Sequence, residues 1–129
     1  MLQSIFISAE LSTLNKAENI ERTILLKGTL RYEGFQFTEV IGSYKGSSEV
    51  SFLVDCDNLV DLDKLKKLAF GNYKQDSIGL LSDKGELSLS YYSGTVENLG
   101  TLNRIHSKFI ESIESYSIIH GDVYTTETI

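Results

Sequence analysis

Residues 35–54 read FQFTEVIGSYKGSSEVSFLV, a stretch with the pattern of two paired strands. Apolar and polar residues alternate on both sides of a segment rich in Gly and Ser, as in strands that bury one face. One face would carry Phe35, Phe37, Glu39 and Ile41, the other Gln36, Thr38 and Val40, and the alternation resumes at Val50, Phe52 and Val54. The pattern predicts an antiparallel hairpin whose loop runs from Gly42 to Glu49.

On the N-terminal side of the hairpin, the sequence predicts a strand and then an amphipathic helix. The strand covers Gln3–Ala9, where β-branched residues recur at alternate positions. Ser12 or Thr13 would cap the helix. Its buried stripe, spaced by three and four residues, would be Leu14, Ala17, Ile20, Ile24 and Leu25. The helix has two possible ends, Gly28 and Gly34, and the good helix formers between them favour Gly34.

On the C-terminal side, a second helix and two further strands are predicted. Asp57 or Asp61 would cap the helix, and Gly71 would end it. Its buried stripe would be Leu62, Leu65 and Ala69, with Leu68 beside them. The strands would be Asp76–Leu81 and Glu86–Tyr92, joined by the turn 82–85.

The predicted order β-α-β-β-α-β, with one extra strand, is that of the ferredoxin-like, or split βαβ, arrangement. The C-terminal part would add a helix over Leu102–Ile113 and a short strand over Ser117–Tyr124, and Thr125–Ile129 would be a frayed tail. No repeat or linker divides the chain. We therefore expect one α+β domain over residues 1–129, a ferredoxin-like sandwich with C-terminal helix and strand additions.

Composition narrows the classes of partner. The chain has 18 acidic against 12 basic residues and no basic cluster, which argues against binding a nucleic-acid backbone. Its single cysteine, Cys56, allows no disulfide within the chain, and we expect it to be a small buried residue in a reducing compartment. No signal peptide and no apolar stretch of ~18–20 residues is present, so a soluble, cytoplasmic protein without membrane contact is expected.

The sequence predicts no metal site and no nucleotide-binding glycine motif. His106 and His120 lie fourteen residues apart, and neither has Cys56 or a carboxylate at a recognised ligand spacing. Surface or interface histidines are the favoured interpretation. Neither the dinucleotide-binding glycine pattern nor a P-loop occurs.

The hairpin loop is the best candidate for a ligand site. Gly42, Ser43, Gly46 and Ser47 would offer backbone N–H groups to a ligand, although a turn that needs glycine for its backbone angles has the same composition. Tyr44 and Glu49 stand at the two ends of the loop, where an aromatic ring and a carboxylate suit a cationic ligand. A solvated Glu and a half-buried Tyr are the alternative.

Gln75 is the third candidate. It lies at the start of a strand that we expect beside the hairpin, where its amide would both donate and accept hydrogen bonds to a polar ligand. A polar residue at an element boundary is the plainer interpretation.

The stretch from Ile41 to Leu81 resembles the phage S-adenosylmethionine lyases, formerly called hydrolases. The similar pieces are GSYKG, the Glu of SSEVSFLV, the helix segment LKKLAF, and QDSIGLL. The motif residues of that family, a Tyr, a Glu and a Gln, fall on Tyr44, Glu49 and Gln75. The resemblance implies a PII-like fold assembled as a homotrimer, with S-adenosylmethionine bound between subunits. It also implies cleavage to 5'-methylthioadenosine and L-homoserine lactone, which in a phage-infected cell protects against restriction.

The implied reaction needs no cofactor, because the sulfonium of S-adenosylmethionine is its own leaving group and its carboxylate is the nucleophile. Orientation of an intramolecular reaction can supply ~7–11 kcal/mol. In this hypothesis Glu49 binds the substrate ammonium, Tyr44 shapes the wall beside the sulfonium, and Gln75 holds a carboxylate or the ribose. Two rivals remain: a non-catalytic PII-like trimer that binds or sequesters a nucleotide or S-adenosylmethionine, and a phage protein that inhibits a host protein through its acidic surface.

Overall fold

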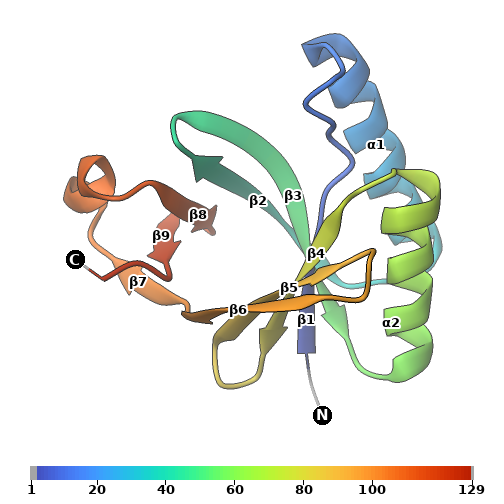
Figure 1. The fold of residues 1–129 in the computed structure, drawn as a ribbon. Helices are drawn as coiled ribbons and strands as arrows, with labels where there is room; N and C mark the ends of the chain where they lie inside the picture. The colour runs from blue at the N-terminus through green and yellow to red at the C-terminus, as the bar shows by residue number, and fades with distance from the viewer. Residues whose placement is uncertain (1–2, 129) are drawn as a thin grey trace.

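The computed structural model describes residues 3–128 as one curled antiparallel sheet with two helices packed on one side of it (Figure 1). The helices are α1 (Lys16–Tyr32) and α2 (Leu59–Lys66), the latter continued by a π-type turn, Lys67–Asn72, and a 3-10 helix covers Ser107–Ser112. The strands are β1 (Gln3–Ile7), β2 (Phe37–Tyr44), β3 (Ser47–Cys56), β4 (Ser77–Ser82), β5 (Glu86–Tyr91), β6 (Val96–Thr101), β7 (Asn103–Ile105), β8 (Ser115–Ile119) and β9 (Asp122–Thr125).

The sheet is nearly closed on itself. Its nine strands follow the order β6-β5-β4-β1-β3-β2-β8-β9-β7, and each neighbouring pair is antiparallel. The two edge strands, β6 and β7, are consecutive in the chain and are joined by Leu102 alone. The Leu102 N–H donates to the Gly85 carbonyl at 2.8 Å. The curl therefore brings the two edges together and leaves a concave face on the side away from the helices (Figure 1).

The predicted ferredoxin-like, PII-like sandwich is wrong. The predicted order of elements is present up to β4, but β4, β1, β3 and β2 are only the middle of a nine-stranded curled sheet. The helix predicted over Leu102–Ile113 is in fact β7 and the 3-10 helix, and the single strand predicted over Ser117–Tyr124 is the hairpin β8–β9. The turn at His120 and Gly121, with φ values of 51° and 81°, folds this hairpin, and β8 then occupies the edge of β2. The free strand edges thus find partners within the chain.

Helix α1 begins later than predicted and buries a different stripe. Asn15, not Ser12 or Thr13, caps it, and Asn15 and Glu18 form a reciprocal capping box. The helix ends at Tyr32, and Gly34 follows with φ of +81°, which confirms the later of the two predicted ends. The buried residues are Leu26 and Leu30, whereas Ile20, Ile24 and Leu25 are 50%, 63% and 58% exposed. The predicted stripe therefore lies largely outside the core.

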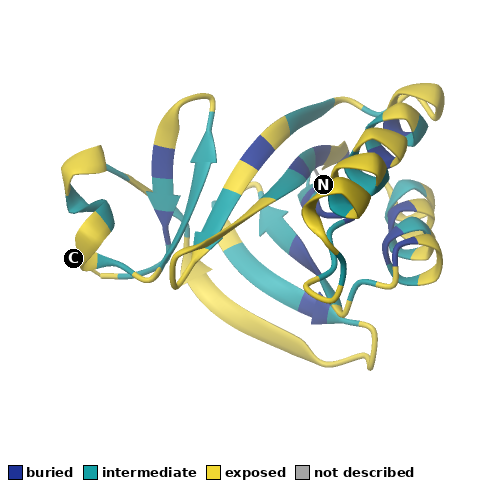
Figure 2. Ribbon diagram, turned by 90° about the horizontal axis from the view of Figure 1, so that it is seen from above, coloured by how far each residue is buried: buried dark blue, intermediate teal, exposed yellow. Residues whose placement is uncertain are grey.

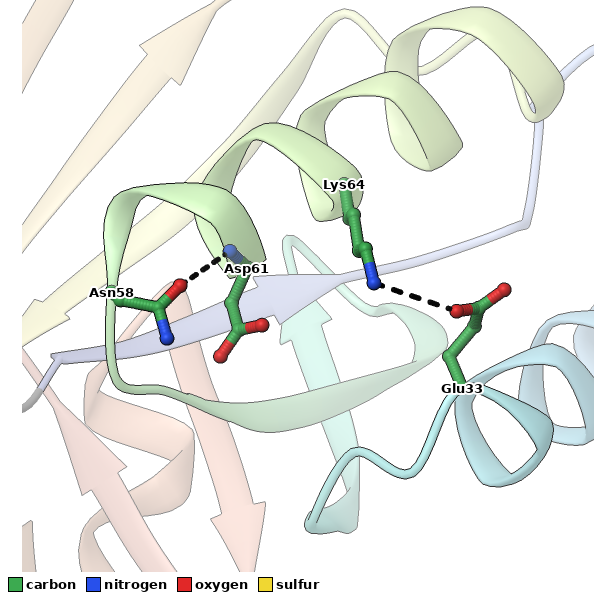
Figure 3. A network of polar contacts seen from close by, with 4 residues as sticks. All are labelled: Glu33, Asn58, Asp61 and Lys64. Carbon is green, nitrogen blue, oxygen red and sulfur yellow. Dashed lines mark hydrogen bonds and ion pairs between the residues drawn. The ribbon is translucent and has the colours of Figure 1, made fainter.

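Helix α2 is fixed at its start and to its neighbour by polar contacts (Figure 3). The Asn58 side chain accepts a hydrogen bond from the Asp61 N–H at 2.9 Å, so Asn58 is the cap, in place of the predicted Asp57 or Asp61. The Lys64 ammonium lies 3.8 Å from the Glu33 carboxylate at the end of α1. The wider π-type turn then carries the chain toward Gln75, whose N–H donates to the Ala69 carbonyl at 3.0 Å.

The core lies between the helices and one face of the sheet (Figure 2). Its fully buried side chains include Ile5, Ile7, Leu26, Leu30, Phe52, Val54, Leu65 and Ile78. Cys56 is also buried, as predicted, and burial raises the pKa of its thiol. Because side chains alternate along a strand, the residues between these core positions face the concave side. Within residues 3–128, no helix is long and apolar enough to cross a membrane.

Candidate active site

The concave face of the sheet encloses a cavity of about 520 Å³. This volume lies in the range of ~300–1,000 Å³ typical of small-molecule sites. Most of the strand residues that line it alternate with core residues: Phe6 lies between Ile5 and Ile7 in β1, and Ser51 precedes Phe52 in β3. The fold thus builds the core on one face of its central strands and the cavity on the other.

Three predicted residues, Tyr44, Glu49 and Gln75, all line this one cavity. Tyr44 is the last residue of β2, Glu49 lies near the start of β3, and Gln75 lies in the connection between the π-type turn and β4. The sequence predicts the strand after Gln75 beside the hairpin, but this is wrong, because β1 lies between β4 and β3. The Gln75 side chain is held at the site by a hydrogen bond to Glu10, in the segment that follows β1.

The predicted loop Gly42–Glu49 is in fact a strand ladder. Gly42 pairs with Glu49 and Ser43 with Ser48, so only Lys45 and Gly46 form the turn, at φ values of 49° and 85°. This is a two-residue hairpin turn whose backbone angles favour glycine. The Lys45 N–H donates to the Glu114 carbonyl at 2.8 Å and is not free for a ligand.

The four predicted substrate-binding residues of this segment are placed differently from one another. Gly42 shares the cavity face with its partners Glu49 and Ser117, and Ser47 pairs with Tyr44 on the same face. Ser43, one position along, points to the other face, and Gly46 is in the turn. None of Gly42, Ser43, Gly46 and Ser47 is among the residues that line the cavity.

The Glu49 carboxyl has a raised pKa. Burial by surrounding atoms is the main cause and the negative charge of Glu10 adds to it, while the nearby Ser8 hydroxyl opposes the rise. Glu10 lies beside Glu49 on the same cavity wall, and one of its carboxylate oxygens accepts the Val50 N–H at 2.5 Å. Two acidic groups close together favour a cationic ligand.

Gln75 is held by carbonyl groups on its amide nitrogen. Its Nε2 donates to the Glu10 carbonyl at 3.0 Å and to the Tyr73 carbonyl at 3.4 Å. The amide oxygen has no hydrogen-bond donor among residues 3–128. The side chain therefore presents an oriented acceptor to the cavity.

The Tyr44 side chain is 57% exposed, and the Lys45 ammonium lies 5.3 Å from the centre of its ring. This is a cation–π distance. The ring thus already attracts a positive charge in the free protein. A cationic ligand would take the other face of the ring or displace Lys45.

The apolar wall of the cavity was not predicted from the sequence. It is formed by Phe6 in β1, Leu87 and Leu89 in β5, and Leu99 in β6. Glu10 was missed as well, because it follows the predicted first strand without belonging to any motif. The available signal was the strand alternation itself: every second residue, opposite the predicted core positions, faces the concave side.

The histidines do not form a metal site. His106 Nδ1 accepts the Lys108 N–H at 3.0 Å, and His120 Nε2 lies 3.4 Å from the Thr38 hydroxyl. In the part of the chain that the structure describes, no three His, Cys, Asp or Glu side chains are grouped to hold a metal ion.

A second, larger cavity of about 770 Å³ lies between α1 and the β2–β3 hairpin. Its apolar lining includes Ile20, Ile24 and Ile41, which are 50%, 63% and 45% exposed. Glu10 and Glu49 line this cavity too, so the two cavities adjoin at these two residues.

The structure is a small α+β domain with a cavity on the concave face of its sheet, lined by both acidic and apolar side chains. The model of the S-adenosylmethionine lyase family matches residues 5–127 of the 129, and the chain belongs to this family. The match runs from β1 to beyond β9 and so extends far outside the forty-residue resemblance found in the sequence. Membership supports S-adenosylmethionine lyase activity and a small-molecule substrate, S-adenosylmethionine. Among curated proteins, none matches the sequence.

Gly79 is expected to be intolerant of a side chain. It pairs with Phe6 across β1 and β4, and a Cβ on Gly79 would lie 3.0 Å from the Phe6 Cβ and 3.1 Å from its ring. Gly79→Ala should therefore lower the free energy of unfolding by about 1–3 kcal/mol, the usual cost of overpacking, measured by urea denaturation. Gly71→Ala is the control, because no atom beyond its chain neighbours and its own helix backbone lies within 4 Å of its Cβ position. Equal urea midpoints for the two variants would contradict the close approach.

Glu49→Gln is expected to stabilise the protein at neutral pH. Because the folded-state pKa of Glu49 is raised, wild-type stability falls as pH rises from the unfolded pKa through the folded one. The variant has no such penalty, so its melting temperature should exceed that of the wild type at pH 7. The difference should vanish below the unfolded pKa, where both side chains are neutral. A lower melting temperature for the variant at pH 7 would refute the raised pKa.

Proposed function

We propose that this chain cleaves S-adenosylmethionine to 5'-methylthioadenosine and L-homoserine lactone in the concave-face cavity. The observation that carries the proposal is the meeting of Tyr44, Glu49 and Gln75 on the wall of one cavity in a chain of this family. The apolar wall suits the adenosine, and the acidic wall suits the ammonium and sulfonium ends.

The proposed step is an intramolecular displacement. One oxygen of the substrate carboxylate attacks the γ-carbon, the bond from this carbon to sulfur breaks, and the sulfur leaves with the electron pair as neutral methylthioadenosine. The lactone keeps the ammonium, so charge balances without any proton transfer. No protein nucleophile or base takes part, and the protein acts by orienting the methionine chain and excluding water.

Each candidate residue has a role in this scheme. Glu49 accepts the substrate ammonium in a charge-assisted hydrogen bond. Tyr44 borders the sulfonium with its ring or hydroxyl. Gln75 presents its Oε1 to a ribose hydroxyl, because its Nε2 already donates to the carbonyls of Glu10 and Tyr73.

The assembly belongs to the proposal too: a homotrimer with its sites between subunits. The cavity between α1 and the β2–β3 hairpin exposes isoleucines that a second copy of the chain would cover. Glu49 lines this cavity too, so a subunit bound there would border the substrate. Light scattering should give three times the 14.4 kDa of one chain. A monomer at the concentrations used for activity would contradict this assembly.

The biological role that fits this reaction is phage anti-restriction, because destroying S-adenosylmethionine in the bacterial cytoplasm removes the substrate of methylation and restriction systems. A binding protein that only sequesters the molecule would serve the same end, and the products separate the two. The sequestering protein returns S-adenosylmethionine unaltered.

The intramolecular mechanism is tested by running the reaction in ¹⁸O-water and analysing the products by mass spectrometry. Carboxylate attack gives a lactone without ¹⁸O, and later opening of the lactone places the label in the carboxyl group. Attack of water on the γ-carbon would instead place the label in the γ-hydroxyl of homoserine. Label in that hydroxyl would overturn the lyase step while leaving the site in place.

A further inference from the structure

The segment Ser8–Glu10, just after β1, lies between the two parts of the site. On one side of it is the strand that carries Glu49, and on the other is the connection that carries Gln75. Ladder pairing between β1 and β3 ends at Ile7 and Phe52, before the chain reaches this segment. Beyond this point, side-chain hydrogen bonds connect the segment to β3.

The segment Ser8–Glu10 binds both the N–H and the carbonyl of Val50. The Ser8 hydroxyl donates to the Val50 carbonyl at 3.0 Å, and the Glu10 carboxylate accepts the Val50 N–H at 2.5 Å. The Ser8 oxygen also accepts the Glu10 N–H at 3.1 Å, which fixes the segment itself. Val50 follows Glu49 in the chain. These bonds therefore fix the position and direction of β3 at the point from which the Glu49 side chain projects.

Glu10 also holds Gln75, on the other side of the site. The Glu10 carbonyl accepts Gln75 Nε2 at 3.0 Å. Glu10 therefore bonds to the Glu49 strand through its side chain and to the Gln75 side chain through its backbone. A shift of either contact would change the distance between the two groups that we propose to hold the substrate.

We propose that Glu10 is the positioning residue of the site, setting the spacing and relative orientation of Glu49 and Gln75. This inference rests on the proposed function and extends it to a residue that no motif contains. The negative charge of Glu10 also raises the pKa of the neighbouring Glu49 carboxyl. The other titratable groups facing the two cavities are Lys16 on α1, Glu39 and Tyr44 on β2, and Asp76 before β4.

Two variants separate the contact from the charge. Glu10→Ala removes the acceptor for the Val50 N–H, and a misplaced group can cost up to ~10²-fold in rate, so we expect kcat to fall about 10- to 100-fold. Glu10→Gln keeps an acceptor oxygen and should recover most of this loss. It also removes a negative charge beside Glu49, so the acidic limb of its kcat/KM profile should move to lower pH. Glu86→Gln, on an exposed strand end, is the matched control and should leave the profile unchanged.

The hydrogen bond itself is read without any turnover. The Val50 amide proton of ¹⁵N-labelled wild type should shift with the ionisation of Glu10, and this shift should be absent in Glu10→Gln. An unchanged Val50 resonance would overturn the inference. So would a folded Glu10→Ala protein with wild-type kcat and pH profile. If that variant does not fold, an unmoved acidic limb in Glu10→Gln would have the same force.

Failure of the proposed function is distinguishable from failure of this inference. If the wild type leaves S-adenosylmethionine intact, the lyase proposal fails, and the inference is judged by affinity for S-adenosylmethionine measured by calorimetry. Binding about tenfold or more weaker in Glu10→Ala, with recovery in Glu10→Gln, would support the positioning role. Equal affinities would overturn it.

Discussion

Glu49→Gln is expected to lower kcat/KM for S-adenosylmethionine by about 10- to 150-fold. A hydrogen bond to a charged group is worth ~1.5–3 kcal/mol, and each ~1.4 kcal/mol is a factor of ten in rate. Glutamine keeps the size of the side chain and one acceptor oxygen but removes the charge that pairs with the ammonium. The measurement is methylthioadenosine release followed by chromatography over a range of substrate concentrations.

Stability gives this prediction an internal control. Because the pKa of Glu49 is raised in the folded protein, the variant should be at least as stable as the wild type at pH 7, and its loss of activity cannot then come from unfolding. Glu86→Gln should retain wild-type kinetics. Full activity of Glu49→Gln would refute the ammonium-binding role.

Arg22→Ala is expected to have the largest effect on stability among the polar residues around the site. The guanidinium donates to the Ala9 carbonyl at 2.7 Å and to the Tyr73 carbonyl at 2.6 Å, and it lies 5.2 Å from the centre of the Tyr73 ring. It thereby links α1 to the segments that carry Glu10 and Gln75. Losing these contacts should lower the free energy of unfolding by about 2–4 kcal/mol, measured by urea denaturation.

Arg22→Lys should recover only part of this loss, because a compact ammonium lacks the fork of donors that reaches two carbonyls. The control is Arg31→Ala, whose side chain is exposed and lies 6.0 Å from the Phe37 ring, so that its cost should be within ~1 kcal/mol. Similar unfolding free energies for the two alanine variants would show that Arg22 has no special structural role.

The local elements of the first 90 residues could be predicted because their signals are local. Alternation in β2 and β3 predicted the hairpin, and Gly34 predicted the end of α1. In the structure this glycine has a positive φ. The stripe of α1 could not be assigned in the same way, because Ile20 and Ile24 are apolar and correctly spaced yet lie outside the core. Periodicity shows which residues share a helix face but not what that face contacts.

The architecture depended on the C-terminal third, where local signals were misleading. The residues from Leu102 onward fit a helical spacing, but pairing with distant strands decides their structure: β8 pairs with β2, and β7 with β9. Such long-range pairing is a tertiary effect that overrides local preference. Without these strands the sheet could not be predicted to curl and to enclose a cavity.

A shared cavity for the candidate residues could be predicted only where a motif marks them. Tyr44, Glu49 and Gln75 follow from the family resemblance, and they do line one cavity, although the Gly42–Glu49 segment is a strand ladder and not a loop. Glu10 carries no motif, and its contacts exist only because β1 ends where it does. A residue that acts through the backbone of its neighbours leaves no spacing rule in the sequence.

Product analysis with the purified protein shows whether this chain cleaves S-adenosylmethionine, as we propose for the concave-face cavity. The wild type should convert S-adenosylmethionine to methylthioadenosine without any added metal or cofactor, and Glu49→Gln should do so far more slowly. Intact S-adenosylmethionine after prolonged incubation with folded wild-type protein would contradict the claim.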